Sequence, residues 1–344
     1  MKKIVLFNHK GGVSKTTSTF HIGWMIAEMG HKVLLVDADP QCNLTSFFLG
    51  DNFDSYYDAE DTKHENIMDG VKPVFEGSPT AIKAVRCTTS QRNNNLYLLA
   101  GHMNLSEYDA QLNFAFTGSR AMLSLKSLPG SFNDLIEKTA SSIEAEYVFI
   151  DLNPGLSTIN QDLFLISDAF IIPTNPDTFS LMAIKSLSLI LPRWVDWKRN
   201  NIDFFKESAY PLPEGTPKFI GEIPQRFNIR NGSPTTPFKE KIEELSQLTK
   251  TVFIPALERA DMLFSHDVYS SVDISTEDYK LAEIKDFQGL SPKSHKINVP
   301  VYALTDEELG TTGAALEGQK QNRTEFKQIY NTIAKIIIEI LKKC

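Results

Sequence analysis

The sequence contains little cysteine. Only three of its 344 residues are cysteine, and Cys42, Cys87 and Cys344 lie far apart along the chain. An odd number of widely spaced cysteines forms neither a disulfide framework nor a CxxC pair. The composition therefore argues against disulfide, zinc and iron–sulfur chemistry, and it favours a reducing cytoplasm as the compartment.

Long hydrophobic runs are also missing. The longest, such as Ala169–Pro173 and Ile336–Ile338, are far shorter than the ~20 apolar residues that a membrane-spanning helix needs. The apolar stretch Ile4–Phe7 is too short for a secretory signal and runs straight into a glycine-containing segment. We therefore expect no integral membrane segment and no export, which again predicts a cytoplasmic protein.

Basic residues are fewer than acidic residues. The chain has 43 acidic and 35 basic residues, a formal net charge of −8 and a pI of about 5.5. No overall positive field attracts it to nucleic acid or anionic lipid, so such a contact must come from a local patch. Two candidates are the helical face with Arg323, Lys327 and Lys335, and the basic and aromatic cluster Trp194–Arg199. Solvated helix faces are the competing interpretation of both.

What the sequence does contain is an alternation of strand and helix patterns. Apolar, β-branched runs alternating with helical stretches predict an α/β fold, with a doubly wound, mostly parallel sheet flanked by helices. An apolar stripe over Arg323–Leu341 predicts a closing helix packed on the sheet. The predicted strands are Lys3–Asn8, Lys32–Val36, Leu96–Ala100, Tyr147–Asp151, Ala169–Thr174, Phe219–Ile223 and Val252–Ile254.

Two segments interrupt this alternation. Asp51–Asn66 holds six acidic residues and one lysine without a sustained period, which predicts a solvated inserted loop. Ser265–Val299 is polar with little periodicity, which predicts a divergent C-terminal excursion from the sheet. We expect residues 1–344 to form a single domain with these two insertions.

A glycine-containing segment lies between the first predicted strand and the first predicted helix, where a phosphate-binding loop belongs. Its glycines let backbone N–H groups converge on phosphate oxygens, and the helix N-terminus adds its dipole. Lys15 can reach the outer phosphates, and the Thr16 hydroxyl can ligate Mg²⁺. The usual GxxxxGK[ST] pattern is not met, because His9 and Ser14 stand at its glycine positions. The segment consists of Lys10, Gly11, Gly12, Val13, Ser14, Lys15, Thr16 and Thr17.

The segment does fit KGGxxK[ST], the deviant Walker A motif, and here the sequence resembles the ParA/MinD superfamily of P-loop ATPases, closest to ParA-type partition ATPases. The resemblance implies that ATP and Mg²⁺ bind at this loop and that Lys15 takes part in catalysis. It also implies that Lys10 reaches the partner's nucleotide in an ATP-dependent homodimer. A tight turn with two solvated lysines is the alternative interpretation.

Further family elements follow along the chain. The run from Asp37 to Asn43 resembles the family's DxDPQxN element, which makes Asp39 the catalytic carboxylate and places Asp37 in the metal shell. The strand that ends at Asp151 resembles a Walker B strand, whose aspartate binds Mg²⁺ through water. By the same resemblance, Pro255 ends a strand and lies near adenine.

Other residues and departures are less specific. Gln225 or Asn228 is a candidate to read the adenine edge, with an ordinary turn as the alternative. The family usually has DxPP after the Walker B strand, and Asn153 departs from it, which leaves the response of this switch loop to the γ-phosphate open.

The resemblance predicts a ParA-like ATPase, in which ATP-dependent dimerisation and hydrolysis drive plasmid or chromosome partition or cargo positioning. It implies non-specific DNA as the track, a ParB-like activating partner and association with the nucleoid. The pattern starts directly with the first strand, so we expect no helix-turn-helix domain before the ATPase and no operator recognition.

A MinD-like, membrane-associated positioning ATPase is the alternative, and its mark is a C-terminal amphipathic helix added to the fold. A third class contains ATP-dependent ligases and iron–sulfur reductases. The cysteine count argues against the reductases, and the DxDPQxN element favours the ParA branch over the ligases.

Overall fold

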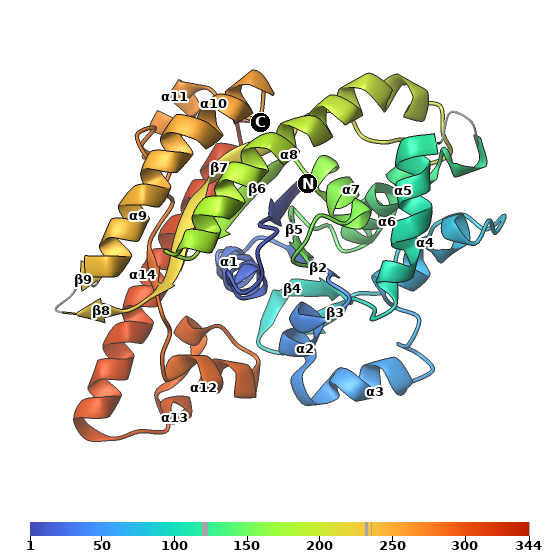
Figure 1. Cartoon of the computed structure of the whole chain (residues 1–344). Coiled ribbons are helices and arrows are strands. Elements are labelled where there is room, and N and C mark those ends of the chain that lie inside the picture. Colours follow the sequence, from blue (N-terminus) through green and yellow to red (C-terminus); the bar gives the residue numbers. More distant parts are fainter. Residues whose placement is uncertain (119–122, 231–232, 235, 344) are drawn as a thin grey trace.

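The computed structural model describes residues 1–118, 123–230, 233–234 and 236–343. Within them, eight strands form one sheet, and all neighbours in it run parallel except β3, which is antiparallel to β4 (Figure 1). The predicted doubly wound, mostly parallel α/β sheet is therefore confirmed. In spatial order the strands are β10 (Ile284–Lys285), β7 (Lys218–Phe227), β6 (Ala169–Thr174), β1 (Lys2–Leu6), β5 (Tyr147–Leu152), β2 (Val33–Ala38), β4 (Asn93–Leu99) and β3 (Thr88–Ser90).

Helices cover both faces of this sheet. The long helices are α1 (Lys15–Glu28), α6 (Leu128–Ser142), α8 (Thr178–Phe205), α9 (Thr236–Leu248) and α14 (Gly313–Leu341). The shorter ones are α2 (Asn43–Leu49), α3 (Phe53–Asp58), α4 (Ile67–Phe75), α5 (Asp109–Gly118), α7 (Thr158–Leu165), α10 (Ile254–Arg259), α11 (His266–Ser270), α12 (Leu290–Ile297) and α13 (Asp306–Leu309). Single turns are η1 (Gly50–Asn52), η2 (Leu105–Tyr108), η3 (Leu123–Leu125), the π-helical η4 (Thr249–Phe253) and η5 (Val301–Ala303), and β8 (Ile229–Arg230) pairs with β9 (Ser233–Pro234).

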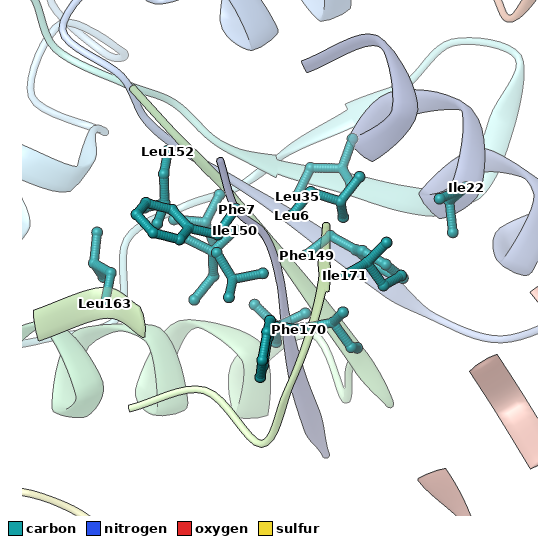
Figure 2. Packing of buried hydrophobic residues seen from close by; sticks show 14 of the residues in the cluster. Leu6, Phe7, Ile22, Leu35, Phe149, Ile150, Leu152, Leu163, Phe170 and Ile171 are labelled. Atoms are coloured by element: carbon teal, nitrogen blue, oxygen red, sulfur yellow. The ribbon is translucent and has the colours of Figure 1, made fainter. Parts of the chain in front are cut away.

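The direction of each strand crossover decides which face a helix covers. Right-handed crossovers from β1 to β2 and from β5 to β6 run in opposite directions across the sheet, so α1 and α7 lie on opposite faces. Helix α14 packs against α1, and α8 packs against α7, α9 and α10. Figure 2 shows this arrangement from close by, with Ile22 of α1 on one side of the strands and Leu163 of α7 on the other.

The central strands are apolar up to their carboxyl ends because both of their faces are covered. Every residue of β2, β5 and β6 is buried, and Leu6, Phe149 and Phe170 belong to one continuous core (Figure 2). Since β1, β2, β5, β6 and β7 are parallel, the loops that follow them meet at one edge of the sheet. That edge holds the sequence motifs.

One predicted strand is wrong. The run Val252–Ile254 belongs to the π-helical turn η4 and to the start of α10. Pro255 is the second residue of α10, directly after the π-helical turn η4, and Phe253 is buried edge-to-face on Phe219. The place beside β7 is taken by β10, which comes from the predicted excursion at residues 265–299.

The acidic segment is also more ordered than predicted. Within Asp51–Asn66 the structure has η1 and α3, and Tyr56 is buried with its hydroxyl donating to the Glu65 carbonyl at 2.6 Å. The segment is mostly exposed or half-buried, as predicted, but its first part is helical. The closing helix is confirmed, and it begins at Gly313, before the predicted start. Among the helices in the described part of the chain, none has the length and hydropathy of a membrane span.

Candidate nucleotide-binding site

The segment predicted to bind phosphate links β1 to α1. Gly12 has a φ of 73° and Ser14 a φ of 57°, so the chain passes twice through the left-handed region before α1 begins at Lys15. Glycine adopts this conformation freely, whereas serine does so at a cost. The Ser14 side chain caps no N–H group that the structure describes. The first N–H groups of α1 are therefore available to an anion.

Polar side chains from the ends of β6 and β7 hold the carbonyl groups of this loop. The Gly12 carbonyl accepts from Asn175 Nδ2 at 3.1 Å and from an Arg226 guanidinium nitrogen at 3.0 Å. The Val13 carbonyl accepts from Gln225 Nε2 at 2.7 Å, and Gln225 Oε1 accepts from Ser18 at 3.0 Å. Gln225 therefore braces the loop with both ends of its amide, and it also lines the cavity beside the loop. Its role at the adenine edge stays a prediction.

Lys15 lies inside the site. Its side chain is buried, and Nζ donates to the Lys10 carbonyl at 3.2 Å. Burial lowers the pKa of Lys15, while the nearby carboxylates of Asp151 and Asp39 act to raise it. Its ammonium thus faces two carboxylates from other strands, close to the start of α1.

Asp37 and Asp151 are direct neighbours at the carboxyl ends of β2 and β5. Asp37 is fully occupied: Oδ2 accepts from the Thr45 N–H at 2.8 Å and the Thr45 hydroxyl at 2.7 Å, and Oδ1 accepts from the Asp39 N–H at 3.1 Å. Burial nevertheless raises the pKa of Asp37 to about 6, against the lowering effect of these bonds. Asp37 therefore anchors the loop that carries Asp39.

The surroundings of Asp151 differ from those of Asp37. It is completely buried, and among the described residues neither of its oxygens has a hydrogen-bond partner. Burial raises its pKa well above the ordinary value, and Asp37 adds to this, while the nearby Thr16 hydroxyl and Lys15 ammonium lower it. The Thr16 hydroxyl lies near the Asp151 carboxylate but forms no well-directed hydrogen bond with it. Two orphaned carboxylate oxygens beside a hydroxyl fit a divalent cation.

Mg²⁺ matches this donor set. The described residues contain no group of three or more His, Cys, Asp or Glu side chains that could hold a metal ion. Mg²⁺ needs no such cage, because it uses one or two carboxylates together with water and substrate phosphates.

A cavity of about 590 Å³ opens over the loop. Asp39 lines it, is itself buried, and accepts from the Gln41 N–H at 2.9 Å; burial raises its pKa. A second cavity of about 240 Å³ shares four lining residues with the first: Ser14, Thr17, Arg226 and His295. The two cavities therefore adjoin at these residues.

Sequence reasoning missed His295 and Phe47. Phe47 of α2 stacks on His295 of α12 with centroids 4.3 Å apart, and both line the larger cavity. Burial lowers the pKa of His295, which keeps the imidazole neutral at pH 7. His295 belongs to the segment predicted as an excursion, and no local pattern signals that this segment returns to the loop.

Lys10 points away from its own cavity. Its ammonium binds the Asp177 carboxylate at 2.5 Å and the Ser180 hydroxyl at 3.2 Å. Asp177 also caps the N-terminus of α8 through the Ser180 N–H. Burial alone raises the pKa of Asp177, but the hydrogen bonds from Lys10 and Ser180 outweigh it, so the net direction is down.

Pro255 is not brought to this site. It does not line either cavity, and its neighbour Phe253 packs on Phe219 near the amino end of β7. The expected place beside adenine rested on the strand that the structure replaces with α10. We therefore assign Pro255 no contact with the base.

The two predicted basic patches differ in exposure: Lys327 and Lys335 of the first are exposed, whereas Trp194 and Lys198 of the second are buried. Arg323 donates to the Leu304 carbonyl and pairs with Asp306 at 2.8 Å, and Lys327 pairs with Glu28 at 3.4 Å, whereas Lys335 is exposed. In the second cluster, Trp194 is buried against Phe7 and Phe164, and Trp197 stacks on Phe116. Lys198 is buried and donates to the Leu165 carbonyl at 2.6 Å. The Trp194–Arg199 cluster thus supports the core and is not a nucleic-acid surface.

A family model described as an AAA domain matches residues 1–204, which is more than half of the chain. The chain belongs to the ParA/MinD-type family of P-loop ATPases. Membership explains why the glycine loop, Asp37, Asp39 and Asp151 share one edge of the sheet. All of them lie within the matched residues.

Relatives of this family member include bacterial and archaeal proteins. An uncharacterized protein of Methanocaldococcus jannaschii is 28% identical over 248 residues, which cover 72% of this chain and 80% of the relative. The sporulation initiation inhibitor protein Soj of Bacillus subtilis is 27% identical over 186 residues, which cover 54% of this chain and 63% of Soj. The alignment with Soj thus stops short of two thirds of its length.

Solved structures of the family share the fold. The pNOB8 ParA structure bound to nonspecific DNA has a TM-score of 0.56 at 18% identity and covers 99% of both chains. The Cyanothece McdA(D38A)–ATP complex has a TM-score of 0.55 at 18% identity and covers 94% of this chain and 96% of that one. At 18% sequence identity, the similarity to these structures shows a shared fold.

Proposed function

We propose that this chain is a ParA-like ATPase whose ATP-dependent dimerisation and hydrolysis drive DNA partition or cargo positioning. One observation carries the proposal: the glycine loop, the buried Lys15, and the carboxylates of Asp39 and Asp151 converge at one sheet edge beside a cavity of about 590 Å³. The chromosome partitioning protein ParA of Caulobacter vibrioides, which is 26% identical over 194 residues, supports the same function.

The phosphates of ATP are proposed to bind at the N-terminus of α1, where free N–H groups and the helix dipole favour negative charge. Lys15 then exchanges the Lys10 carbonyl for the outer phosphates. Thr16 and Asp151 are the residues that would hold Mg²⁺, with Asp37 positioned behind them, and the ion supplies neutralisation of phosphate charge when bound. The adjoining cavity of about 240 Å³ is proposed for the base.

Asp39 is proposed to orient the water that attacks the γ-phosphorus. Its carboxylate lines the phosphate cavity, and the Gln41 N–H holds one of its oxygens. The other oxygen is available to accept a hydrogen bond from water. Such a group acts mainly in the transition state, so its removal affects hydrolysis more than ATP binding.

Lys10 is proposed to act on the nucleotide of a second copy. In this structure it is held by Asp177 at the start of α8, and exposed apolar side chains lie near this point. Phe179 and Met182 in the first turns of α8 are 69% and 61% exposed, and Leu156, which follows the Walker B strand, is 46% exposed. Apolar side chains exposed around a functional loop are typical of an interaction surface. They favour a homodimer that closes over this edge.

Non-specific DNA is the proposed track, with a ParB-like activator and a nucleoid location. The MinD-like alternative is less favoured, because the apolar stripe of α14 is used in packing. Tyr330, Ile333 and Ile337 are buried, and α14 packs against α1. An amphipathic helix that packs on its own core has no apolar face left for a membrane.

The test of this function uses the Asp39→Ala variant, which is expected to bind ATP without turning it over. The variant should sediment with random-sequence DNA in ATP and Mg²⁺ and stay in solution with ADP, and anionic vesicles should not retain it. Lys15→Ala is the control that should lose ATP binding. Retention by vesicles and not by DNA would replace this function with the MinD-like one.

A further inference from the structure

Arg226 has an unusual backbone for an exposed side chain. Its φ is 62°, in the left-handed region that glycine or asparagine occupies more readily than arginine. It lies at an irregularity of the sheet: Gln225 pairs with Ile284 and Phe227 with Lys285, so Arg226 is the extra residue on β7. Such bulges redirect a side chain, and they are common beside functional sites.

The bulge directs Arg226 to the phosphate-binding loop. A guanidinium nitrogen donates to the Gly12 carbonyl at 3.0 Å, and the residue lines both adjoining cavities. Among the residues that the structure describes, no carboxylate forms an ion pair with Arg226. The charge of its guanidinium is therefore uncompensated, and most of its five N–H donors are available.

The place where the two cavities meet indicates which part of the nucleotide Arg226 can contact. Lys15 and Thr16 lie at the outer phosphates in the proposed function, and the base occupies the second cavity. The part of the nucleotide between them, the α-phosphate and the ribose, must pass Ser14, Thr17, Arg226 and His295, because these line both cavities. Arg226 is the cation of this set, since His295 is neutral at pH 7.

We propose that Arg226 binds the α-phosphate of the nucleotide, and that the bulge in β7 directs its guanidinium to this phosphate. A guanidinium can donate to the Gly12 carbonyl and to two phosphate oxygens at once, which a lysine ammonium does less well. The inference rests on the proposed nucleotide site and adds a residue outside the Walker motifs. The Arg226 side chain is exposed, so packing does not explain its strained backbone, whereas a phosphate contact does.

The test compares ATP and ADP affinities by calorimetry in the parent and in Arg226→Asn, which keeps a residue suited to a left-handed backbone. We expect both nucleotides to bind at least fivefold more weakly to the variant, by equal factors, because both contain the α-phosphate. The salt dependence of binding should also decrease. Arg226→Gly should show the same loss, and thermal unfolding should show that both variants are at least as stable as the parent.

Asn175→Ala is the matched control, because it removes the other hydrogen bond to the Gly12 carbonyl and leaves the charge in place. It should weaken both nucleotides less than fivefold. A loss below fivefold in Arg226→Asn, or an equal loss in Asn175→Ala, would overturn the phosphate contact. If the parent itself fails to bind ATP, the proposed function fails first, and this inference with it.

Discussion

The ends of β2 and β5 lie side by side, and each carries an aspartate with very different surroundings. Asp37 accepts three hydrogen bonds, two of them from Thr45, whereas Asp151 accepts none among the described residues, although both are buried. Burying an unpaired carboxylate is costly, so a fold that keeps one at this point reserves it for a charged ligand. We therefore propose that Asp37 belongs to the scaffold of the site and Asp151 to its chemistry.

The largest effect is expected for Asp151→Asn, which should impair ATP hydrolysis and leave the stability of the fold nearly unchanged. Asp151→Asn should lower Mg²⁺-dependent ATP hydrolysis at least ~100-fold, about 2.7 kcal/mol, because the carboxylate that would hold the ion is lost. Its free energy of unfolding without nucleotide should fall by no more than about 1 kcal/mol, since no hydrogen bond is lost. Steady-state kinetics and denaturant titration measure the two quantities. Unimpaired hydrolysis, or a large loss of stability, would remove the contrast with Asp37.

The complementary change is Asp37→Asn, which replaces one carboxylate oxygen by an amide NH₂ and so sets it against the donors of Thr45 or against the N–H of Asp39. We expect a loss of about 2–3 kcal/mol in the free energy of unfolding, the usual range for hydrogen bonds to a charged acceptor. Thr45→Val removes one of these bonds and also the acceptor of the buried Gly101 N–H, so it should cost about 2 kcal/mol. If denaturant titration finds Asp37→Asn as stable as the parent, Asp37 is no anchor.

His21 extends the comparison to a third buried group that is fully occupied. Its Nδ1 meets the Thr17 carbonyl at 2.7 Å and its Nε2 accepts from the Val301 N–H at 3.1 Å, which fixes the neutral ring. Burial lowers the pKa of His21 to about 3, against a partial opposing effect of the Thr17 carbonyl.

The sign of the pH effect follows from this direction. Below about pH 6.5 the unfolded state takes up the proton first, so His21 lowers stability as the pH falls. Between pH 7 and pH 5 the parent should lose about 2 kcal/mol more than His21→Gln, at about 1.36 kcal/mol per pKa unit. Unfolding curves at the two pH values measure the difference. Identical slopes for both proteins would show that His21 is not held neutral.

The smallest effect concerns Ser14, the non-glycine residue with a left-handed backbone in the loop itself. Ser14→Gly should raise the free energy of unfolding by about 0.5–1 kcal/mol, because relief of the left-handed strain exceeds the added entropy of glycine. ATP affinity should stay within about twofold, since the backbone N–H groups are unchanged. Thermal unfolding and calorimetry provide both readings, and a destabilised variant would mean that the Ser14 side chain supports the loop after all.

The parts of the site that sequence could predict are those built locally. Lys10–Thr17 and Asp39 come shortly after buried apolar strands, and Asp151 lies at the carboxyl end of one. Parallel strands bring these ends to one edge without further information. The stripe of α14 was equally readable, because its period of 3.6 extends over many turns. In these places the local pattern and the tertiary structure agree.

Arg226 and His295 were beyond this reasoning. Arg226 reaches Gly12 across 214 positions of sequence through a bulge that leaves no composition signal, and β10, which forms the other side of that bulge, is two residues long. The run Val252–Ile254 shows the opposite failure. Its β-branched residues favour a strand, but the burial of Phe253 on Phe219 and the position of Pro255 favour a helical turn, and tertiary packing decided the outcome.

We propose that ATP closes two copies of this chain over the edge that carries Lys10. Light scattering on Asp39→Ala with ATP and Mg²⁺ tests it most directly, with ADP and the double variant Lys10→Ala, Asp39→Ala as controls. We expect twice the monomer mass in ATP, the monomer mass in ADP, and a double variant that binds ATP and remains a monomer. A monomer mass for Asp39→Ala in saturating ATP, or an equally tight dimer of the double variant, would contradict it.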